Sequence, residues 1–130
     1  DLGNKIGVML ALNCETDFVA NTPDFEGLVR DIAMHIAAAK PRFATREEVT
    51  EEILAKEREI FAHQAKESGK PDNIVEKIVT GKMEKFYEEN CVLEQAFIKD
   101  NSVSVGELIK QKIALLGENI NIGNFSRFEI

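Results

Sequence analysis

The chain has 130 residues, of which 44% are hydrophobic and 30% are charged, as is typical of a single globular domain (residues 1–130) with one core. The formal net charge of −7 argues against a direct nucleic-acid partner, because phosphate binding needs a basic patch. No apolar run is long enough to span a bilayer and no signal-peptide pattern opens the chain, so we expect no membrane partner.

The first predicted element is a β-strand over residues 5–13, with apolar side chains in alternation at Ile6, Val8, Leu10 and Leu12. Residues 1–4 precede it and are expected to form a hairpin turn, because Gly-Asn suits the positive φ angles of such a turn. The chain begins at Asp1 and not at Met, so we expect a fragment or a processed product.

A helix is predicted to begin at Pro23, with Thr22 as its N-cap. We expect it to end before Pro41, because the residue before a proline disfavours helical angles. Its apolar residues follow a three- and four-residue spacing and form one stripe that should pack on a core. They are Phe25, Leu28, Val29, Ile32, Ala33, Ile36 and Ala37.

Residues from about 46 to about 90 are predicted to form an antiparallel helical hairpin. Thr45 and Glu48 have the spacing of a capping box, which should open a helix reaching about Glu67. Gly69 is expected as its C-cap and Pro71 as the first residue of the next helix. The first helix has a thin apolar stripe of Val49, Ile53, Ile60 and Phe61. The second has Ile74, Ile78, Met83 and Phe86, broadened by Val75, Val79 and Tyr87. Thin stripes favour a two-helix projection, although an ordinary packed pair remains open.

The last third of the chain is predicted to hold one helix and a closing strand. Residues 91–98 fit either a strand or an extended crossing segment, and residues 99–101 a loop. Ser104 and Glu107 form a second capping box, so a helix should run from there to Gly117. In the closing strand, over residues 119–130, Ile120 and Ile122 alternate, and Phe128 and Ile130 are expected to resume that alternation after a bulge at Gly123. The predicted fold is α+β: a small antiparallel sheet, helices packed on one face, and the two-helix projection.

The candidate functional residues lie in Asn13 to Asn21, where the first strand ends and the first helix begins. Rigid scaffolds often display functional side chains at such junctions. Asp17 stands next to Phe18, and a ring beside a carboxylate suits insertion into another protein better than catalysis. The local alternative is that Asp17 caps a turn and Phe18 fills the core, because most phenylalanines are buried.

An alternative function is that of a small thiol-dependent enzyme. Cys14 and His35 are its nucleophile and base candidates, but no glycine-rich elbow or orienting acid accompanies them. A hydrogen-bonded, partly buried His35 and a solvated His63 are the simpler interpretation. We expect Cys14 and Cys91 to be reduced thiols. No metal-ligand spacing and no phosphate-binding loop are present, so we expect no cofactor.

Several segments resemble the elongation factor Ts family and follow one another in the family's order. The first is Asn-Cys-Glu-Thr-Asp-Phe-Val-Ala from Asn13. The others are Ala33 to Ala38 before Lys40-Pro41, Ser68 to Pro71, Gly117 to Ile122, and Arg127 to Glu129. The resemblance implies a core module of the short form, without the small N-terminal helical domain. In the long members of that family, the region of the hairpin stands off the core.

The resemblance also implies a function. Members promote release of GDP from elongation factor Tu in translation elongation, without covalent chemistry. Thr16, Asp17, Phe18 and Val19 match the residues that enter the nucleotide domain of that partner, where the ring wedges and the acid disturbs the Mg²⁺ site. A short form is expected to pair as a homodimer, with Ile120 to Ile130 in the contact. Bacterial cytoplasm is favoured over an organelle as its location. A protein-binding scaffold without exchange activity is the alternative.

Overall fold

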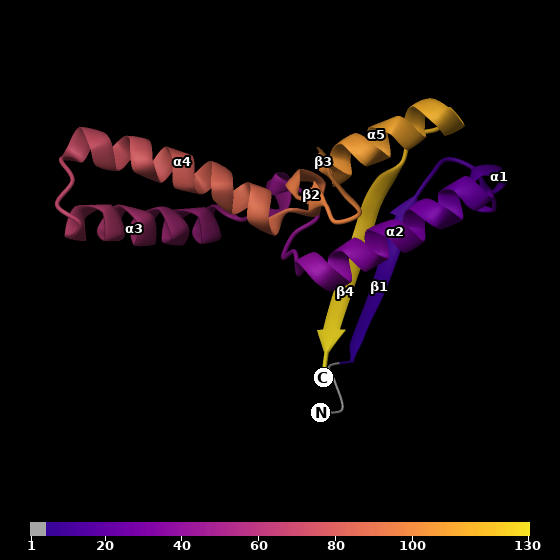
Figure 1. Ribbon diagram of the computed structural model, residues 1–130, viewed down its shortest axis with the longest axis horizontal. Helices are drawn as coiled ribbons and strands as arrows, with labels where there is room; N and C mark the ends of the chain where they lie inside the picture. Colours follow the sequence, from indigo (N-terminus) through magenta and orange to yellow (C-terminus); the bar gives the residue numbers. More distant parts are fainter. Residues whose placement is uncertain (1–4) are drawn as a thin grey trace.

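The computed structural model describes residues 5–130, so the turn expected at residues 1–4 lies outside the described part. The elements in order are β1 (Ile6–Asn13), α1 (Asp17–Ala20), α2 (Pro23–Ala39), η1 (Arg46–Glu48), α3 (Glu51–Glu67), α4 (Asp72–Asn90), η2 (Val92–Glu94), β2 (Ala96–Phe97), β3 (Asp100–Ser104), α5 (Val105–Leu116) and β4 (Asn121–Glu129). Figure 1 shows α3 and α4 projecting as a hairpin from a body that holds β1, β4, α2 and α5. The predicted α+β class is confirmed.

The long strands β1 and β4 pair antiparallel. Ala11 opposes Asn124 while Leu12 opposes Ile122, so Gly123 is the extra residue of a bulge, as predicted. The prediction that Phe128 continues the apolar alternation beyond the bulge was wrong. Phe125 is half-buried there, whereas Phe128 is 59% exposed. One inserted residue moves the inward positions from even to odd numbers, which turns Phe128 outward.

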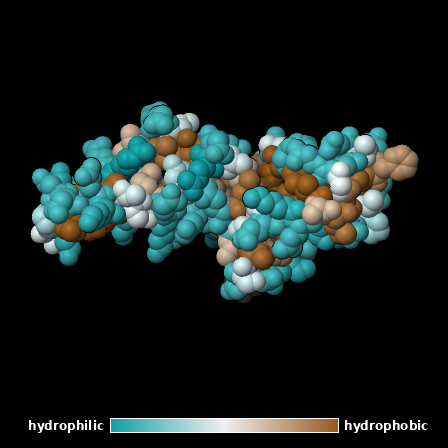
Figure 2. Space-filling model, turned by 90° about the horizontal axis from the view of Figure 1, so that it is seen from above, coloured by the Kyte–Doolittle hydropathy of each residue, from teal (hydrophilic) through white to brown (hydrophobic). Residues whose placement is uncertain are grey.

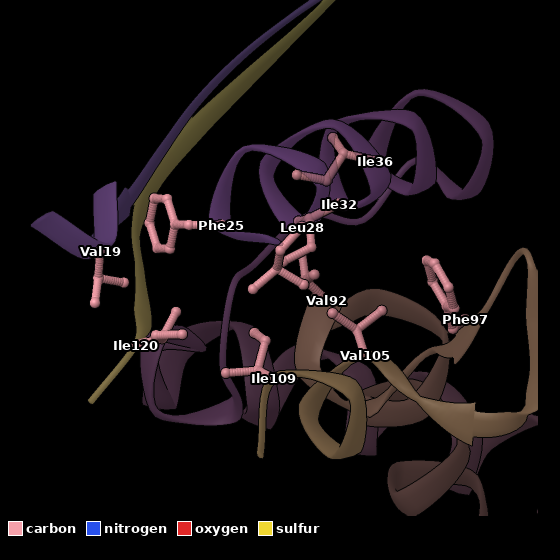
Figure 3. Close-up of a cluster of buried hydrophobic side chains, with 10 residues drawn as sticks. All are labelled: Val19, Phe25, Leu28, Ile32, Ile36, Val92, Phe97, Val105, Ile109 and Ile120. Carbon is pink, nitrogen blue, oxygen red and sulfur yellow. The ribbon is translucent and has the colours of Figure 1, made fainter. Parts of the chain in front are cut away.

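Helix α2 covers the inner face of this sheet and contributes more of the core side chains than any other element. Its start is as predicted, because the Thr22 hydroxyl accepts a hydrogen bond from the Phe25 N–H at 3.1 Å. The chain leaves the helix at Lys40, which has a left-handed φ of 53°. The core side chains converge from α1, α2, η2, β2, α5 and the residue just before β4 (Figure 3). They are Val19, Phe25, Leu28, Ile32, Ile36, Val92, Phe97, Val105, Ile109 and Ile120.

The segment after α4 is neither one strand nor a plain extended crossing, the two forms that the sequence left open. Cys91 bridges to Phe43 in a parallel sense, and the Val92 N–H donates to the Phe43 carbonyl at 2.9 Å. A turn of 3-10 helix and the short antiparallel pair β2–β3 follow. The loop expected at residues 99–101 is shorter, since β3 begins at Asp100. The capping box at Ser104 is confirmed.

The start of the hairpin differs from the prediction. Thr45 makes no capping hydrogen bond, and Arg46–Glu48 form one turn of 3-10 helix. Helix α3 begins at Glu51 instead, where the Thr50 hydroxyl accepts from the Ile53 N–H at 3.2 Å. The Glu48 carboxylate reaches the Ala44 N–H at 3.0 Å, so the predicted box is replaced by a contact one residue earlier.

The two hairpin helices lie side by side, as predicted, but their buried positions differ (Figure 1). Leu54 and Ala65 are buried on α3, whereas Ile60 is 45% exposed. Val75, Met83 and Phe86 are buried on α4, while Ile74 and Ile78 are only half-buried. The prediction that Pro71 is the first residue of the second helix was wrong, because Pro71 is the N-cap of α4. Figure 2 shows a mostly hydrophilic surface over the hairpin.

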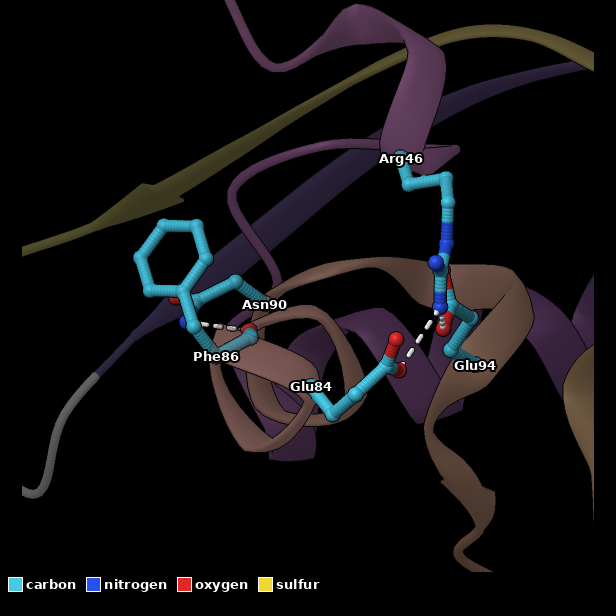
Figure 4. A network of polar contacts seen from close by, with 5 residues as sticks. All are labelled: Arg46, Glu84, Phe86, Asn90 and Glu94. Carbon is cyan, nitrogen blue, oxygen red and sulfur yellow. Dashed lines mark hydrogen bonds and ion pairs between the residues drawn. The ribbon is translucent and has the colours of Figure 1, made fainter. Parts of the chain in front are cut away.

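Arg46 joins the base of the hairpin to the body (Figure 4). Its Nε donates to Glu94 at 2.8 Å, and its Nη2 donates to Glu84 on α4 at 3.2 Å. The guanidinium also lies 4.2 Å from the centre of the Tyr87 ring. The hydrogen bonds to Glu94 and Glu84 raise the pKa of Arg46 above its ordinary range. One side chain therefore ties η1, α4 and η2 together.

No helix within residues 5–130 combines the length and the apolar character that crossing a membrane requires.

Candidate functional site

The candidate residues form a short turn of helix between β1 and α2. Thr16 is the N-cap of α1, and its hydroxyl accepts from the Val19 N–H at 3.3 Å. Val19 is 9% exposed and belongs to the core, so it anchors the turn. The Asp17 carbonyl accepts from the backbone N–H of Asn21 at 3.1 Å and from its side-chain amide at 2.9 Å, which closes the turn at its other end.

Phe18 lies on the outside of this turn and is 90% exposed. The adjacent Asp17 is exposed as well. The local alternative, in which Phe18 fills the core and Asp17 caps the turn, is therefore wrong, because Val19 fills the core and Thr16 provides the cap. Keeping a phenylalanine ring in water forgoes about 2 kcal/mol of hydrophobic burial. A single exposed ring is common, but this one is displayed on a short helix held at both ends.

Sequence reasoning missed the two glutamates that hold this turn. Glu118 follows Gly117, the left-handed C-cap residue of α5. Its Oε1 accepts from the N–H groups of Glu15 at 3.1 Å and Thr16 at 3.0 Å, and its Oε2 accepts from the Thr16 hydroxyl at 2.6 Å. In return, Glu15 Oε2 accepts from the Asn119 N–H at 2.6 Å. Glu118 lies 102 positions from Thr16, so no spacing pattern in the sequence indicates this contact.

The electrostatics of the turn follow from these bonds. The hydrogen bond from the Thr16 hydroxyl lowers the pKa of the Glu118 carboxyl below its ordinary value, with a further contribution from the Thr16 and Glu15 N–H groups. Glu118 is therefore ionised at neutral pH and acts as an acceptor for all three donors.

His35 and Cys14 do not form a catalytic pair. The His35 ring is fully buried, with Nδ1 accepting from the Ile98 N–H at 3.2 Å and Nε2 bonded to Gln95 Oε1 at 2.8 Å. Because Nδ1 accepts, Nε2 carries the proton and both nitrogens are occupied. The Cys14 thiol donates to the Thr16 carbonyl at 3.2 Å. His35 is thus a structural residue, as the simpler interpretation predicted.

The other predicted features have ordinary environments. Cys14 and Cys91 are free thiols, as expected, and burial raises the pKa of Cys91 to about 11. His63 is largely exposed and forms an i,i+4 pair with Glu67 at 3.1 Å. Within residues 5–130, no three His, Cys, Asp or Glu side chains lie close enough to hold a metal ion. An open groove of about 1250 Å³ runs between α3 and α4, lined by charges of both signs.

Comparisons with known proteins connect the chain to one family. The family model described as "Elongation factor TS" matches residues 2–130. Proteins named elongation factor Ts are 55% identical in Moorella thermoacetica and 56% identical in Carboxydothermus hydrogenoformans, each over 98% of this chain. A third, from Solibacter usitatus, is 53% identical over 98% of this chain. The matches cover 63%, 59% and 60% of those proteins, so the chain spans about three fifths of their length.

Proposed function

Because the chain belongs to the elongation factor Ts family, we propose that it promotes the release of GDP from elongation factor Tu during translation elongation. The observation that carries the proposal is the position of Phe18, 90% exposed beside an exposed Asp17 in the family's motif. A factor with this role works where translation takes place, and we therefore assign it to the cytoplasm.

In the proposed mechanism, Phe18 wedges between helices of the nucleotide domain of the partner, and Asp17 disturbs the elements that support Mg²⁺. Magnesium needs near-ideal octahedral geometry and has few protein ligands, so a small displacement weakens its site. GDP then loses its metal and its phosphate contacts together. Thr16 and Val19 contribute by capping and anchoring the turn. No covalent bond is made or broken.

Thermodynamic reciprocity follows from this mechanism. If the chain weakens GDP binding by a given factor, GDP must weaken binding of the chain by the same factor. The complex should therefore be most stable with nucleotide-free elongation factor Tu.

The test is release of a fluorescent GDP from elongation factor Tu, with and without the chain. We expect the chain to accelerate release, and Phe18→Ala to lose about tenfold or more of that effect, as a buried aromatic anchor does at an interface. Met34→Ala, which removes an exposed apolar side chain on α2, is the matched control and should keep the full rate. Binding without acceleration would favour the scaffold alternative, and no binding would contradict both.

We also propose that the chain pairs with a second copy through the outer face of the β1–β4 sheet. Met9, Phe128 and Ile130 are 71%, 59% and 90% exposed, and Met9 and Phe128 lie on the face opposite α2. An uncovered apolar sheet face of this kind suits a two-fold contact. Light scattering after size exclusion should show a dimer that Met9→Lys disrupts, whereas only monomer at micromolar concentrations would refute the pairing.

A further inference from the structure

The connection between α5 and β4 holds the turn that displays Phe18. We propose that Glu118 is a positioning residue for nucleotide exchange, which fixes the direction of the Phe18 ring by holding Thr16. This inference rests on the function proposed above and adds to it a residue outside the motif of residues 16–19.

A single carboxylate, that of Glu118, bonds the start of α1 to a distant part of the chain. It accepts three hydrogen bonds, two from Thr16 and one from Glu15, at 2.6 to 3.1 Å. The segments are 102 positions apart in the chain, so the contact is purely tertiary. In return, the Asn119 N–H donates to the Glu15 carboxylate. The segment after β1 and the connection that follows α5 are therefore hydrogen-bonded to each other in both directions.

These bonds matter because the other hydrogen bonds of α1 are local: Asn21 donates to the Asp17 carbonyl and Thr22 to the Val19 carbonyl. The helix has four residues, Asp17 to Ala20, and an isolated turn of this length is unstable in water. Val19 gives it one anchor in the core. All of these attachments follow Phe18 or lie within the turn, whereas Thr16 held by Glu118 supplies a fixed point on the other side of Phe18.

A carboxylate suits this role better than a neutral group. Both its oxygens accept, and the three donors that face it include two backbone N–H groups and a hydroxyl. Charge-assisted bonds of this kind are stronger than neutral ones. A ring held in its binding direction also loses less conformational freedom on contact, so more of the contact energy remains for displacing the partner's metal site.

The test is a double-mutant cycle in the fluorescent-GDP release assay at saturating chain. We expect Glu118→Ala to slow release about tenfold, in line with the loss of bonds to a charged group. In a Phe18→Ala background the same change should cost less than about twofold, because its effect passes through the ring. Glu118→Gln should be intermediate, since its amide oxygen still accepts from N–H groups but its NH₂ group cannot accept from the hydroxyl.

Glu107→Ala is the matched control. It removes the capping-box carboxylate at the other end of the same helix, α5, and should leave release within about twofold of the unchanged chain. Equal losses from Glu118→Ala with and without Phe18 would overturn the positioning role, because independent effects add.

Amide hydrogen exchange gives a readout that does not depend on the partner. In Glu118→Ala the Glu15 and Thr16 amides should exchange faster, while that of Ile32 in α2 stays protected. Unchanged Thr16 exchange would overturn the proposal. If the unchanged chain fails to accelerate GDP release, the proposed function and the exchange role of Glu118 both fail, whereas faster Thr16 exchange in Glu118→Ala would still support its hold on the turn.

Discussion

Neighbouring residues in the motif have opposite environments, although both are large and apolar. Val19 packs among the side chains of α2 and α5, while Phe18 lies in solvent. On a helix, successive residues are rotated by about 100°, so one turn can bury one side chain and expose the next. We therefore expect substitutions of Val19 to affect stability, and substitutions of Phe18 to affect activity.

Val19→Ala should destabilise the fold by about 2 kcal/mol, because it removes buried methyl groups and leaves a gap in the core. Phe18→Ala should change the free energy of unfolding by less than about 0.5 kcal/mol, as exposed substitutions usually do. Urea denaturation of both variants checks this. A large loss in Phe18→Ala would show that the ring supports the fold and is not free for a partner.

His35 makes the stability depend on pH. Burial lowers its pKa below the ordinary 6.5, an effect only partly offset by the bond to Gln95. The unfolded chain therefore binds a proton in a pH range where the folded chain does not, and stability falls as the pH drops below about 6.5. The slope from one such group is at most about 1.4 kcal/mol per pH unit.

The measurement is urea denaturation of the chain and of His35→Gln between pH 8 and pH 5. The free energy of unfolding should fall more steeply towards pH 5 in the unchanged chain than in the variant, since the other titrating groups are common to both. Parallel pH profiles would mean that His35 protonates equally easily in both states.

At the scale of elements, short-range signals set most of the boundaries. Thr22 and Ser104 cap their helices as their spacing predicts, and Gly117 ends α5 with a φ of 75°. Thr50 is followed directly by two glutamates and Thr45 by Arg46 and then two glutamates, so both match the start signal of a helix. The structure uses Thr50, because Val49 takes an extended conformation and is buried at the base of the hairpin.

Thr50→Ala should therefore destabilise the protein by about 1 kcal/mol, through loss of the cap on the Ile53 N–H. Thr45→Ala is the matched control and should cost less than about 0.5 kcal/mol, because its hydroxyl makes no capping bond. Thermal unfolding of the two variants compares them. A larger loss in Thr45→Ala would place the start of the helix at the earlier threonine.

At the scale of the whole molecule, the hairpin and the body have separate hydrophobic clusters. The cluster at the hairpin base contains Val49, Leu54, Met83, Phe86 and Cys91, none of which belongs to the main core. Arg46 crosses from one part to the other through its bonds to Glu84 and Glu94. The direction of the projection therefore depends on polar contacts, which include the backbone hydrogen bonds between residues 42–44 and 90–93, more than on shared core packing.

Arg46→Ala should loosen the hairpin against the body. The amides of Val92 and Leu93, which donate to the carbonyls of Phe43 and Ala44, should then exchange about tenfold faster, while amides in α2 keep their protection. Arg46→Lys should restore little of this, because an ammonium group cannot make the paired bonds of a guanidinium. Hydrogen exchange read by mass spectrometry tests it, and unchanged exchange in Arg46→Ala would refute the role of this residue.

The amino-acid pattern was sufficient for features that depend on neighbours in the chain: the alternation of β1, the caps of α2 and α5, the antiparallel hairpin and the bulge at Gly123. It was insufficient for those that depend on distant segments. Which apolar residue of the motif faces the core is decided by the packing of Val19 in the main core. Which glutamate holds Thr16 is decided by a contact between residues 102 positions apart. Hydrophobic periodicity in the sequence indicates which face of a helix or strand is apolar. Which residues contact that face depends on how the elements pack together.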